Sequence, residues 1–373
     1  MNAPAVQRPD PADTHLSPEA QSNQPRQLVL LGAGMAHLKL LHTLARKPLP
    51  EVQVTLVAEE THVVHPAMGP GLVAGDYQQE DCTIPLEPLV KRAGIRWLQQ
   101  QPVSLDAGQQ TLALDDGSTQ HYEWLSINAA PAHHNEQLEQ TIPGAGKFGL
   151  CVYPLDTWAQ RWQGVSELAA KKALRVAVIG DQVAALELAL AVQQRLPSCA
   201  VTVLMLPSPA GTPLATAGIT RLLQQLKAQR ITVLHDTALQ IDASAVHLGC
   251  GAQLACDVPL LALQHLPHAW LAASGLALNA DGQATTDGYL RSSSHPQVWV
   301  ANGDLDSPLR HLQAVARGAR LPATTGQPGA GFQLLFGGSQ QAVMAWGGYS
   351  ASGRAWHWLK DWWDRRQLRR YTM

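Results

Sequence analysis

Apolar runs of strand length alternate with apolar residues at helical spacing along most of the chain. Near the N-terminus, the pattern predicts a strand over 28–31, a helix over 35–46 and a strand over 52–57. Strands that alternate with helices in this way are typical of parallel sheets with crossover helices. This part of the chain therefore predicts a Rossmann-like unit.

A second series of the same kind begins near residue 174. It predicts strands over 174–179 and 200–206, a helix over 184–196 between them, and a return to the first unit through a strand over 297–301. We therefore expect an α/β fold with two Rossmann-like domains, the second inserted in the first.

Two further elements are predicted between these series. Residues 110–114 and 120–127 form a hairpin in this interpretation, because Asp115-Asp116-Gly117 supplies a turn of the type that joins antiparallel strands. Residues 1–26 are rich in Pro, Gln, Asn and Ala and lack an apolar run, so they are predicted to be a disordered leader.

Composition narrows the classes of function. The chain has 373 residues, of which 46% are hydrophobic and 15% are charged, and its formal net charge is -2. This charge gives no general attraction to nucleic acid. The five cysteines show no Cys-x-x-Cys pair, and the scattered histidines lack the spacing of a metal site, so neither a redox disulfide nor a metal is predicted.

The first strand runs directly into a phosphate-binding type of turn. Gly32 permits the tight turn, Gly34 lets the main chain approach a diphosphate, and the helix that opens at Met35 offers free N–H groups. Ala33 lies between the two glycines. Glu59, or its neighbour Glu60, follows the next strand and is the candidate to bind a ribose.

The second series keeps less of this pattern. Gly180 retains the first glycine, but Gln182 and Ala185 replace the other two, and Asp181 adds negative charge where a diphosphate would lie. Two interpretations stay open here. The unit is either a scaffold that has lost its ligand or a weak, unusual site for a nicotinamide nucleotide.

These motifs resemble those of the flavoproteins with two dinucleotide-binding domains, the pyridine nucleotide-disulfide oxidoreductase superfamily. Within this superfamily, the chain resembles type II NADH dehydrogenases and the similar flavoprotein module fused to selenide, water dikinase. Gly32, Gly34 and His37 match the flavin-side motif, and residues 68–77 are similar to a segment beside the flavin ring. Residues 298–304 resemble the late Gly-Asp motif.

The resemblance implies FAD as the cofactor and assigns further residues to it. Met68 and its neighbours would border the flavin ring, and Gly303 with Asp304 would hold the ribityl chain or the phosphate. The implied domains are an FAD-binding domain over 27–150 and 272–342 and an NAD(P)-binding-like domain over 151–271.

The tail over 343–373 is rich in Trp and Arg. A helix from Ala355 would place Trp356, Trp358, Trp362 and Trp363 on one face and Lys360, Asp361, Asp364 and Arg365 on the other, with arginines following. Such an amphipathic helix suits a membrane surface, and it equally suits packing on the protein's own body or on a second copy in a homodimer.

The combined prediction is an FAD-dependent oxidoreductase that passes electrons from a small-molecule donor through flavin to an acceptor such as a quinone. NAD(P)H is a doubtful donor because of the altered second motif, and no catalytic side chain is assigned. We expect a cytoplasmic protein, peripheral on the inner face of the membrane if the tail binds lipid. The alternative is a non-catalytic protein that binds flavin or a partner and has lost its nicotinamide site.

Overall fold

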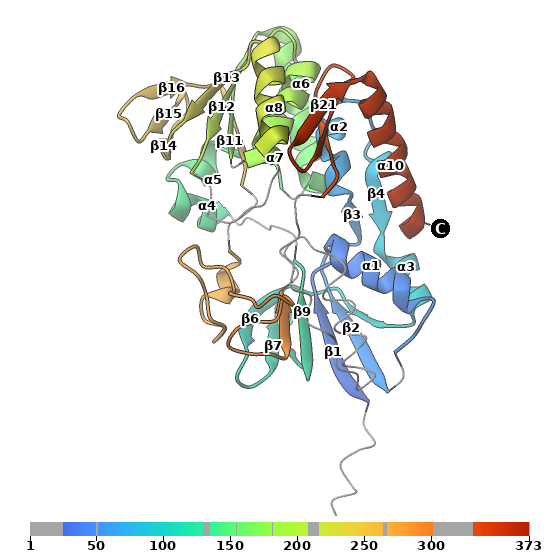
Figure 1. Ribbon diagram of the computed structural model, residues 1–373. Coiled ribbons are helices and arrows are strands. Elements are labelled where there is room, and N and C mark those ends of the chain that lie inside the picture. Colours follow the sequence, from blue (N-terminus) through green and yellow to red (C-terminus); the bar gives the residue numbers. More distant parts are fainter. Residues whose placement is uncertain are drawn as a thin grey trace, which may run out of the picture.

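A computed structural model describes residues 25–49, 51–129, 135–153, 155–180, 182–207, 216–263, 267–300 and 331–372 (Figure 1). Its main feature is a pair of five-stranded parallel sheets, one at the bottom and one at the top of Figure 1. Helices connect the strands of both sheets, as the predicted alternation of strands and helices requires. The expected α/β fold with two Rossmann-like domains is confirmed, whereas the exact domain boundaries stay a prediction.

The first sheet has the strand order of a dinucleotide-binding fold. Its strands, in spatial order, are β18 (Val298–Val300), β9 (Trp124–Ile127), β1 (Arg26–Leu31), β2 (Val52–Val57) and β5 (Arg96–Leu98). Helices α1 (Met35–Leu44) and α3 (Leu86–Ala93) connect the strands on the β1 side and contact one another. The direction of connection reverses between β1 and β9, and ligands of such sheets bind at the carboxyl ends of the strands at this point.

The second sheet repeats this design. Its strands, in spatial order, are β10 (Leu150–Cys151), β17 (Val258–Ala262), β11 (Arg175–Gly180), β12 (Ala200–Met205) and β13 (Thr232–His235). The helices beside it are α6 (Leu155–Lys171), α7 (Gln182–Arg195) and α8 (Thr216–Ala228). Because β18 follows this unit in the sequence but pairs with β9, the chain returns to the first sheet, as an inserted domain requires.

Smaller elements fill the space around the two sheets. The short strands are β3 (His62–Val64), β4 (Thr83–Pro85), β6 (Pro102–Asp106), β7 (Thr111–Leu114), β8 (Thr119–His121), β14 (Ala238–Ile241), β15 (Ala245–Leu248) and β16 (Gln253–Ala255). The short helices are η2 (Pro66–Met68), α2 (Gly69–Ala74), η3 (Glu80–Cys82), α4 (Asn135–Thr141), α5 (Ala145–Phe148) and η4 (Ala269–Leu271).

One predicted strand is in fact two strands in different sheets. The hairpin about Asp115–Gly117 exists as β7 and β8, but β8 ends at His121, and β9 begins at Trp124 as a parallel strand of the first sheet. The break occurs because Tyr122 N–H donates to Gln110 O while Glu123 N–H donates to Gln27 O, so the chain crosses from one sheet to the other.

The two halves of the molecule are joined through apolar contacts. Helix α2 packs against α7 of the second unit. Met68, just before α2, is fully buried in the same core as Trp158 of α6, and the Trp162 indole donates to Val73 O at 3.2 Å. Met68 and α2 belong to residues 68–77, which resemble the segment beside the flavin ring. They therefore lie between the two units.

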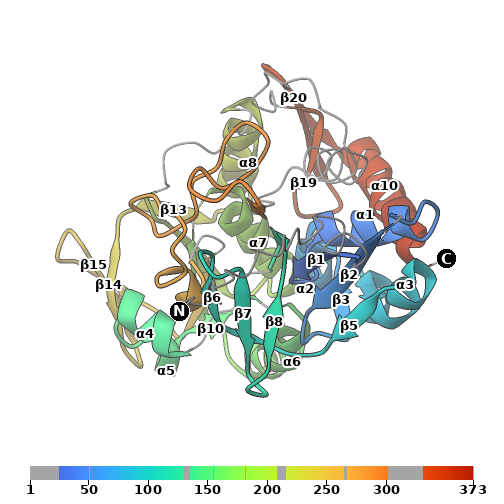
Figure 2. The same cartoon turned by 90° about the horizontal axis from the view of Figure 1, so that it is seen from below.

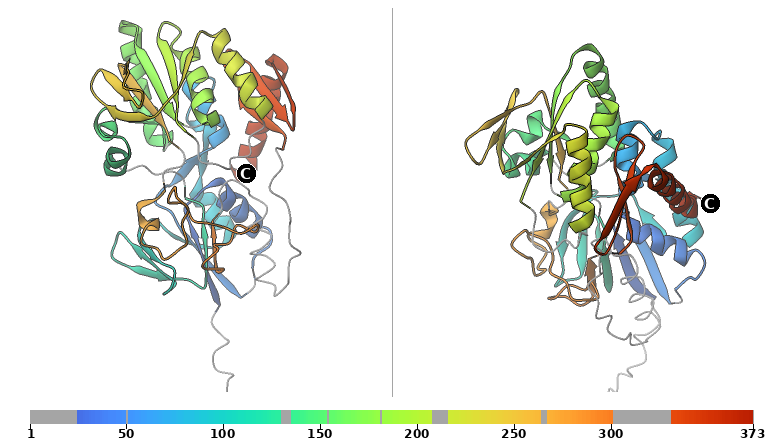
Figure 3. Two further views of the ribbon diagram at one scale, coloured as in Figure 1. Left: turned by 60° about the vertical axis from the view of Figure 1, so that its left-hand side comes forward. Right: turned by 45° about the horizontal axis from the view of Figure 1, so that its top comes forward.

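The tail forms a small sheet followed by a long helix. Its elements are β19 (Gln333–Phe336), β20 (Ala342–Trp346), β21 (Tyr349–Gly353) and α10 (Arg354–Thr372). The sheet lies against α8, and α10 runs down the right of Figure 1 from the second unit to α1 and α3. Figure 2 and both views of Figure 3 show α10 on the outside of the molecule, and in Figure 2 it lies beside α1 and α3.

The face of α10 that meets the body is the charged one, opposite to what an amphipathic helix suggests. Lys360, Asp364 and Tyr371 are buried, whereas Trp358, Trp362 and Trp363 are 71%, 44% and 46% exposed. Helix α10 therefore packs on the protein's own body through its charged face, and these three tryptophans lie on its exposed side. In the described part of the chain, no helix has the length and apolar character needed to cross a bilayer.

Candidate functional site

The turn between β1 and α1 depends on both of its glycines. Gly32 has a φ of +86°, and a Cβ there would lie 2.4 Å from Ala129 Cα. Gly34 N–H donates to Asn128 O at 2.9 Å, and a Cβ on Gly34 would lie 2.3 Å from Asn128 Oδ1. The turn therefore lies directly against the residues that follow β9. A side chain at Gly32 or Gly34 would push the turn and these residues apart.

Asn128 is a site residue that the sequence analysis missed. Its Oδ1 accepts from the N–H groups of Ala36 and His37, at 3.0 and 3.3 Å, and so caps the first turn of α1. Within the described residues, the N–H groups of Ala33 and Met35 have no protein acceptor and remain for a ligand. A polar residue directly after a buried strand at the reversal point was the available signal.

His37 replaces the third glycine of the usual motif and ties the turn together. It is buried, its Nδ1 lies 2.6 Å from Gly32 O, and its Nε2 lies 2.9 Å from Ser126 Oγ on β9. Burial lowers the pKa of His37 to about 4, a shift partly offset by the bond to Gly32 O. The ring is therefore neutral near pH 7 and acts as a link between β1, α1 and β9.

This burial makes stability pH-dependent. The unfolded chain takes up a proton on this ring near pH 6.5, whereas the folded protein does so only near pH 4. Acidification from pH 7 to pH 5 should therefore favour unfolding by about 2 kcal/mol through His37, or about 2–3 °C in Tm for a chain of this length. We expect the Tm of a His37→Gln variant, measured by circular dichroism, to fall less over this pH range.

A suitable control is His235→Gln, at an exposed position on β13. It should keep the full pH-dependent fall of the unchanged protein. Equal falls for the His37 variant and the unchanged protein would show that the ring is not held neutral.

The remaining predicted site residues are placed as follows. Glu59 lies exposed two residues beyond the end of β2 and accepts a hydrogen bond from the Gln101 side chain. Met68 is wholly buried, and its neighbours His65, Pro66 and Ala67 line the open space instead. Gly303 and Asp304 lie outside the described residues.

A cleft of about 1380 Å³ opens onto the N-terminus of α1. Met35, Ala36 and Asn128 line one end of it, and further walls come from α3, η2, β19 and α10. The first residues of α1, their cap Asn128 and the segment before Met68 therefore face one continuous space.

The floor of this cleft holds buried ionisable groups. Asp364 and His65 line it, and the Lys360 ammonium pairs with Asp364 while donating to Ala67 O at 2.7 Å. Burial, and after it the charge of Lys360, lower the pKa of His65 to about 4. His65 Nδ1 has no hydrogen-bond partner in the described protein.

Glu187 of α7 belongs to the same group. Its Oε1 accepts from Phe336 N–H on β19, and burial raises its pKa to about 7, a shift that Lys360 partly offsets. Four ionisable side chains thus lie close together at the junction of the two units: His65, directly before η2, Glu187 of α7, and Lys360 and Asp364 of α10.

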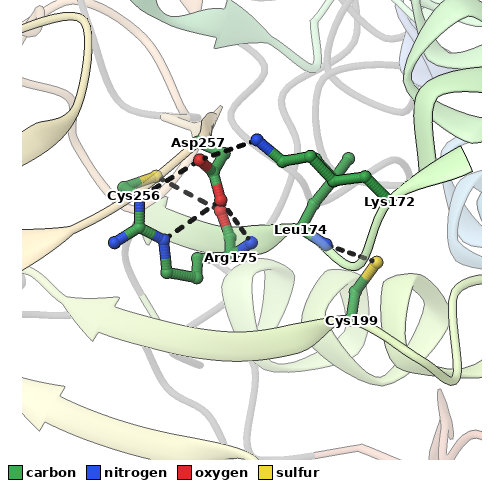
Figure 4. Close-up of polar contacts among 6 residues, drawn as sticks. All are labelled: Lys172, Leu174, Arg175, Cys199, Cys256 and Asp257. Carbon is green, nitrogen blue, oxygen red and sulfur yellow. Dashed lines mark hydrogen bonds and ion pairs between the residues drawn. The ribbon is translucent and has the colours of Figure 1, made fainter.

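The cysteines are not arranged for redox chemistry. All five are in described residues and all are free. Figure 4 shows two of them at the amino ends of the strands of the second sheet, where Cys199 accepts from Leu174 N–H and the Cys256 thiol lies 3.8 Å from Arg175 O. Burial raises the pKa of Cys256 to about 11, so its thiol stays protonated.

The same view shows a structural ion pair. Asp257 accepts from Arg175 through both oxygens, at 3.1 Å each, and Lys172 lies 3.6 Å away (Figure 4). The hydrogen bonds from Arg175 keep the pKa of Asp257 well below its usual range. This cluster holds the loop before β17 at the edge of the sheet opposite to Gly180.

Comparison with known proteins decides the family. The model of a family described as "Pyridine nucleotide-disulphide oxidoreductase" matches residues 26–318. The chain belongs to the pyridine nucleotide-disulphide oxidoreductase family. Members are FAD-dependent oxidoreductases, so FAD is the cofactor of this chain. The prediction of the family and of its cofactor is confirmed.

Two curated relatives are similar over different lengths. The chain is 25% identical over 343 residues to the alternative NAD(P)H-ubiquinone oxidoreductase C1, chloroplastic/mitochondrial, of Arabidopsis thaliana, covering 79% of this chain and 65% of the relative. It is 24% identical over 106 residues to a sulfide-quinone reductase of Aquifex aeolicus, covering 28% of this chain and 24% of the relative. The chain thus spans less than two thirds of either relative.

Solved structures show the same fold. The sulfide:quinone oxidoreductase of Aquifex aeolicus superposes with a TM-score of 0.72 at 14% identity, covering 93% of this chain and 91% of that one. NDH2 from Plasmodium falciparum, in complex with NADH, superposes with a TM-score of 0.67 at 11% identity, covering 93% and 97%. The arrangement of the two Rossmann-like units is therefore that of this family.

The described residues fit the diphosphate and adenosine parts of FAD. Met35 lies where the positive end of α1 meets the cleft, which is a setting that binds phosphate, and Ala33 precedes it in the glycine turn. Glu59 stands at the end of the neighbouring strand, where a carboxylate meets a ribose in such folds.

Proposed function

We propose that this protein passes electrons from a reduced donor through FAD to a quinone. The observation that carries the proposal is the cleft, which connects the N-terminus of α1 with the buried group of His65, Lys360 and Asp364. FAD, when bound, supplies the electron transfer itself. The protein has to hold it, exclude water and provide protons.

The buried group suits a reaction that consumes protons. Reduction of a quinone to a quinol takes up two electrons and two protons. Glu187 has a pKa of about 7 and so exchanges a proton easily near neutral pH, and Asp364 stands at the surface of the cleft. Lys360 pairs with Asp364 and donates to Ala67 O, and its charge favours the neutral form of His65.

The names of the relatives support a quinone as the acceptor. One is a sulfide-quinone reductase and the other an NAD(P)H-ubiquinone oxidoreductase. The donor stays open, because the second unit keeps Gly180 but lacks the later glycines, and Asp181 lies outside the described residues. We infer Gly32, Ala33, Gly34, Met35 and Asn128 as the diphosphate site, Glu59 as the ribose ligand, and Gly303 with Asp304 as ligands of the ribityl chain.

The acceptor can be tested without knowing the donor. Under anaerobic conditions, dithionite would reduce the bound flavin, and a short-chain ubiquinone would then be added in a stopped-flow instrument. We expect reoxidation that saturates with quinone concentration and is faster than that of free reduced FAD. Reoxidation no faster than that of free FAD would favour the non-catalytic alternative.

A second arm of this experiment replaces dithionite by NADH or NADPH. Bleaching of the flavin would identify a nicotinamide nucleotide as donor and a working second site. Without bleaching, the second Rossmann unit is a scaffold and the donor belongs to another class.

We further propose that the outer face of α10 rests on a membrane surface, where a quinone would be found. Trp358 and Trp362 are exposed on one line of the helix, followed by Arg366 and Arg369, and indole rings with nearby cations favour the bilayer interface. A Trp358→Ser/Trp362→Ser variant should sediment with phosphatidylcholine vesicles less than the unchanged protein, with the same Tm. Undiminished sedimentation would refute this contact.

A further inference from the structure

Three helices end at the same place on the surface, and each brings cations with it. Helix α1 ends at Leu44, α3 at Ala93 and α10 at Thr372, and α10 contacts the other two. Figure 2 shows the three helices side by side. The guanidinium groups that line the cleft here are those of Arg46, Arg92, Arg366, Arg369 and Arg370.

None of these five groups is paired with a carboxylate within the described residues. Arg92 donates to the backbone carbonyls of Pro88 and Tyr371, Arg370 donates to the Gln367 amide, and Arg366 lies over the Trp362 ring. Their charge is therefore not neutralised by the protein. The positive charge of the cluster also acts on His42. Burial lowers the pKa of His42 most, and the charges of Arg46, Arg92 and Arg370 lower it as well.

The helix dipoles account for only part of this charge. A helix C-terminus carries about half a negative charge, so three of them offset about one and a half positive charges. Five guanidinium groups leave an excess of more than three. Such an excess, in a concave site with Tyr371 and Trp363 in its wall, is what binds phosphate oxygens.

This end of the cleft is separate from the proposed flavin site. Helix α1 has 10 residues, so its two ends lie about 15 Å apart. The flavin diphosphate is assigned to the N-terminal end, where the main chain provides the donors. The arginines gather at the C-terminal end.

We propose that the arginine cluster at the C-terminal ends of α1, α3 and α10 binds the phosphate group of an anionic ligand. The ligand is either a small organic phosphate or the headgroup of an anionic lipid. In both cases the guanidinium groups of Arg369 and Arg370 on the last turn of α10 would contact the phosphate oxygens.

Charge reversal at Arg369 and Arg370 tests the proposal. The full-length protein would be titrated with inorganic pyrophosphate in a calorimeter, and sedimented with vesicles of phosphatidylglycerol in phosphatidylcholine and of phosphatidylcholine alone. An Arg369→Glu/Arg370→Glu variant should bind about a hundredfold more weakly, since each charged hydrogen bond that is lost commonly costs about a factor of ten. An Arg369→Gln/Arg370→Gln variant, which keeps α10 free of new negative charge, should show an intermediate loss.

Lys171→Glu/Lys227→Glu is the matched control, because both lysines are exposed in the last turns of other helices, α6 and α8. It should bind as tightly as the unchanged protein. Pyrophosphate binding that depends on the arginines identifies a small phosphate, and binding only to phosphatidylglycerol vesicles identifies a lipid headgroup.

Absence of binding to either probe, or equal losses in the arginine and lysine variants, would overturn the proposal. No flavin signal is read in this experiment. If the proposed electron transfer to a quinone were wrong, the result of this phosphate-binding experiment would still test the arginine cluster.

Discussion

Replacing Gly34 by alanine is expected to remove FAD from the protein. The added methyl group would lie 2.3 Å from Asn128 Oδ1 and 2.6 Å from Asn128 O, far inside van der Waals contact. Backbone atoms cannot move aside as a flexible side chain can, so the turn must rise from the end of β9. The N–H groups of Ala33 and Met35 would then no longer point at the diphosphate.

The loss should be large for so small a change. A clash in a packed site commonly costs about 1–3 kcal/mol, and loss of the Asn128 cap adds about 1 kcal/mol. If both costs, about 2–4 kcal/mol together, act on the flavin-bound state, binding weakens by about thirtyfold to about a thousandfold. The measurement is the ratio of flavin absorbance to protein absorbance after dialysis.

Gly164→Ala provides the matched control for the same chemical change. Gly164 lies exposed in α6, with nothing within 4 Å of the position of its Cβ. That variant should keep its flavin and should be slightly more stable, because alanine suits a helix better than glycine. Full flavin content in the Gly34 variant would show that this turn does not hold the cofactor.

The second large effect is expected at Lys360. Its removal by Lys360→Met would leave the buried Asp364 without its partner and Ala67 O without its donor. A buried charge that loses its partner commonly costs about 3–5 kcal/mol. Since Ala67 belongs to the segment beside Met68, we expect both a lower Tm and slower reoxidation of the flavin by quinone.

A double variant separates the charge from the packing. Lys360→Met/Asp364→Leu removes both charges at once, so it should recover most of the stability that the single variant loses. Lys91→Met breaks the exposed pair of Lys91 with Glu87 and should leave the Tm nearly unchanged, because exposed ion pairs contribute little to stability. A single Lys360 variant as stable as the unchanged protein, or a double variant no more stable than the single one, would contradict this account.

Local patterns in the sequence predict the frame of the site. Gly32, Gly34 and the apolar strand before them define the β1 turn, because few other sequences allow a positive φ and so close an approach between the turn and the end of a strand. Glu59 follows from its distance to that turn. These features are local, so a single stretch of sequence contains them.

The residues that the sequence analysis missed depend on contacts between distant segments. Asn128 caps α1 from 92 positions away along the chain. Its place directly after a buried strand marks it as a candidate polar residue, but the local sequence does not show that its partner is α1. The strands β19 to β21 were not predicted, although Val343 and Ala345 alternate before the turn at Gly347. Short strands of this kind are stabilised by the helix on which they pack rather than by their own sequence.

The orientation of α10 shows the same limit. Its two faces can be read from the sequence, but the face that is buried depends on partners elsewhere. Tyr77 donates to Asp361 at 2.8 Å and Ala67 O accepts from Lys360, so the charged face finds its hydrogen bonds on the body. The tryptophans are left outside.

The central claim is that this chain binds FAD with its diphosphate at the N-terminus of α1. Its most direct test is to denature the purified protein by heat and to identify the released cofactor by chromatography. We predict a yellow supernatant that contains FAD in proportion to the protein, and little from the Gly34→Ala variant. A colourless supernatant without any flavin, from protein with an intact fold, would contradict the claim.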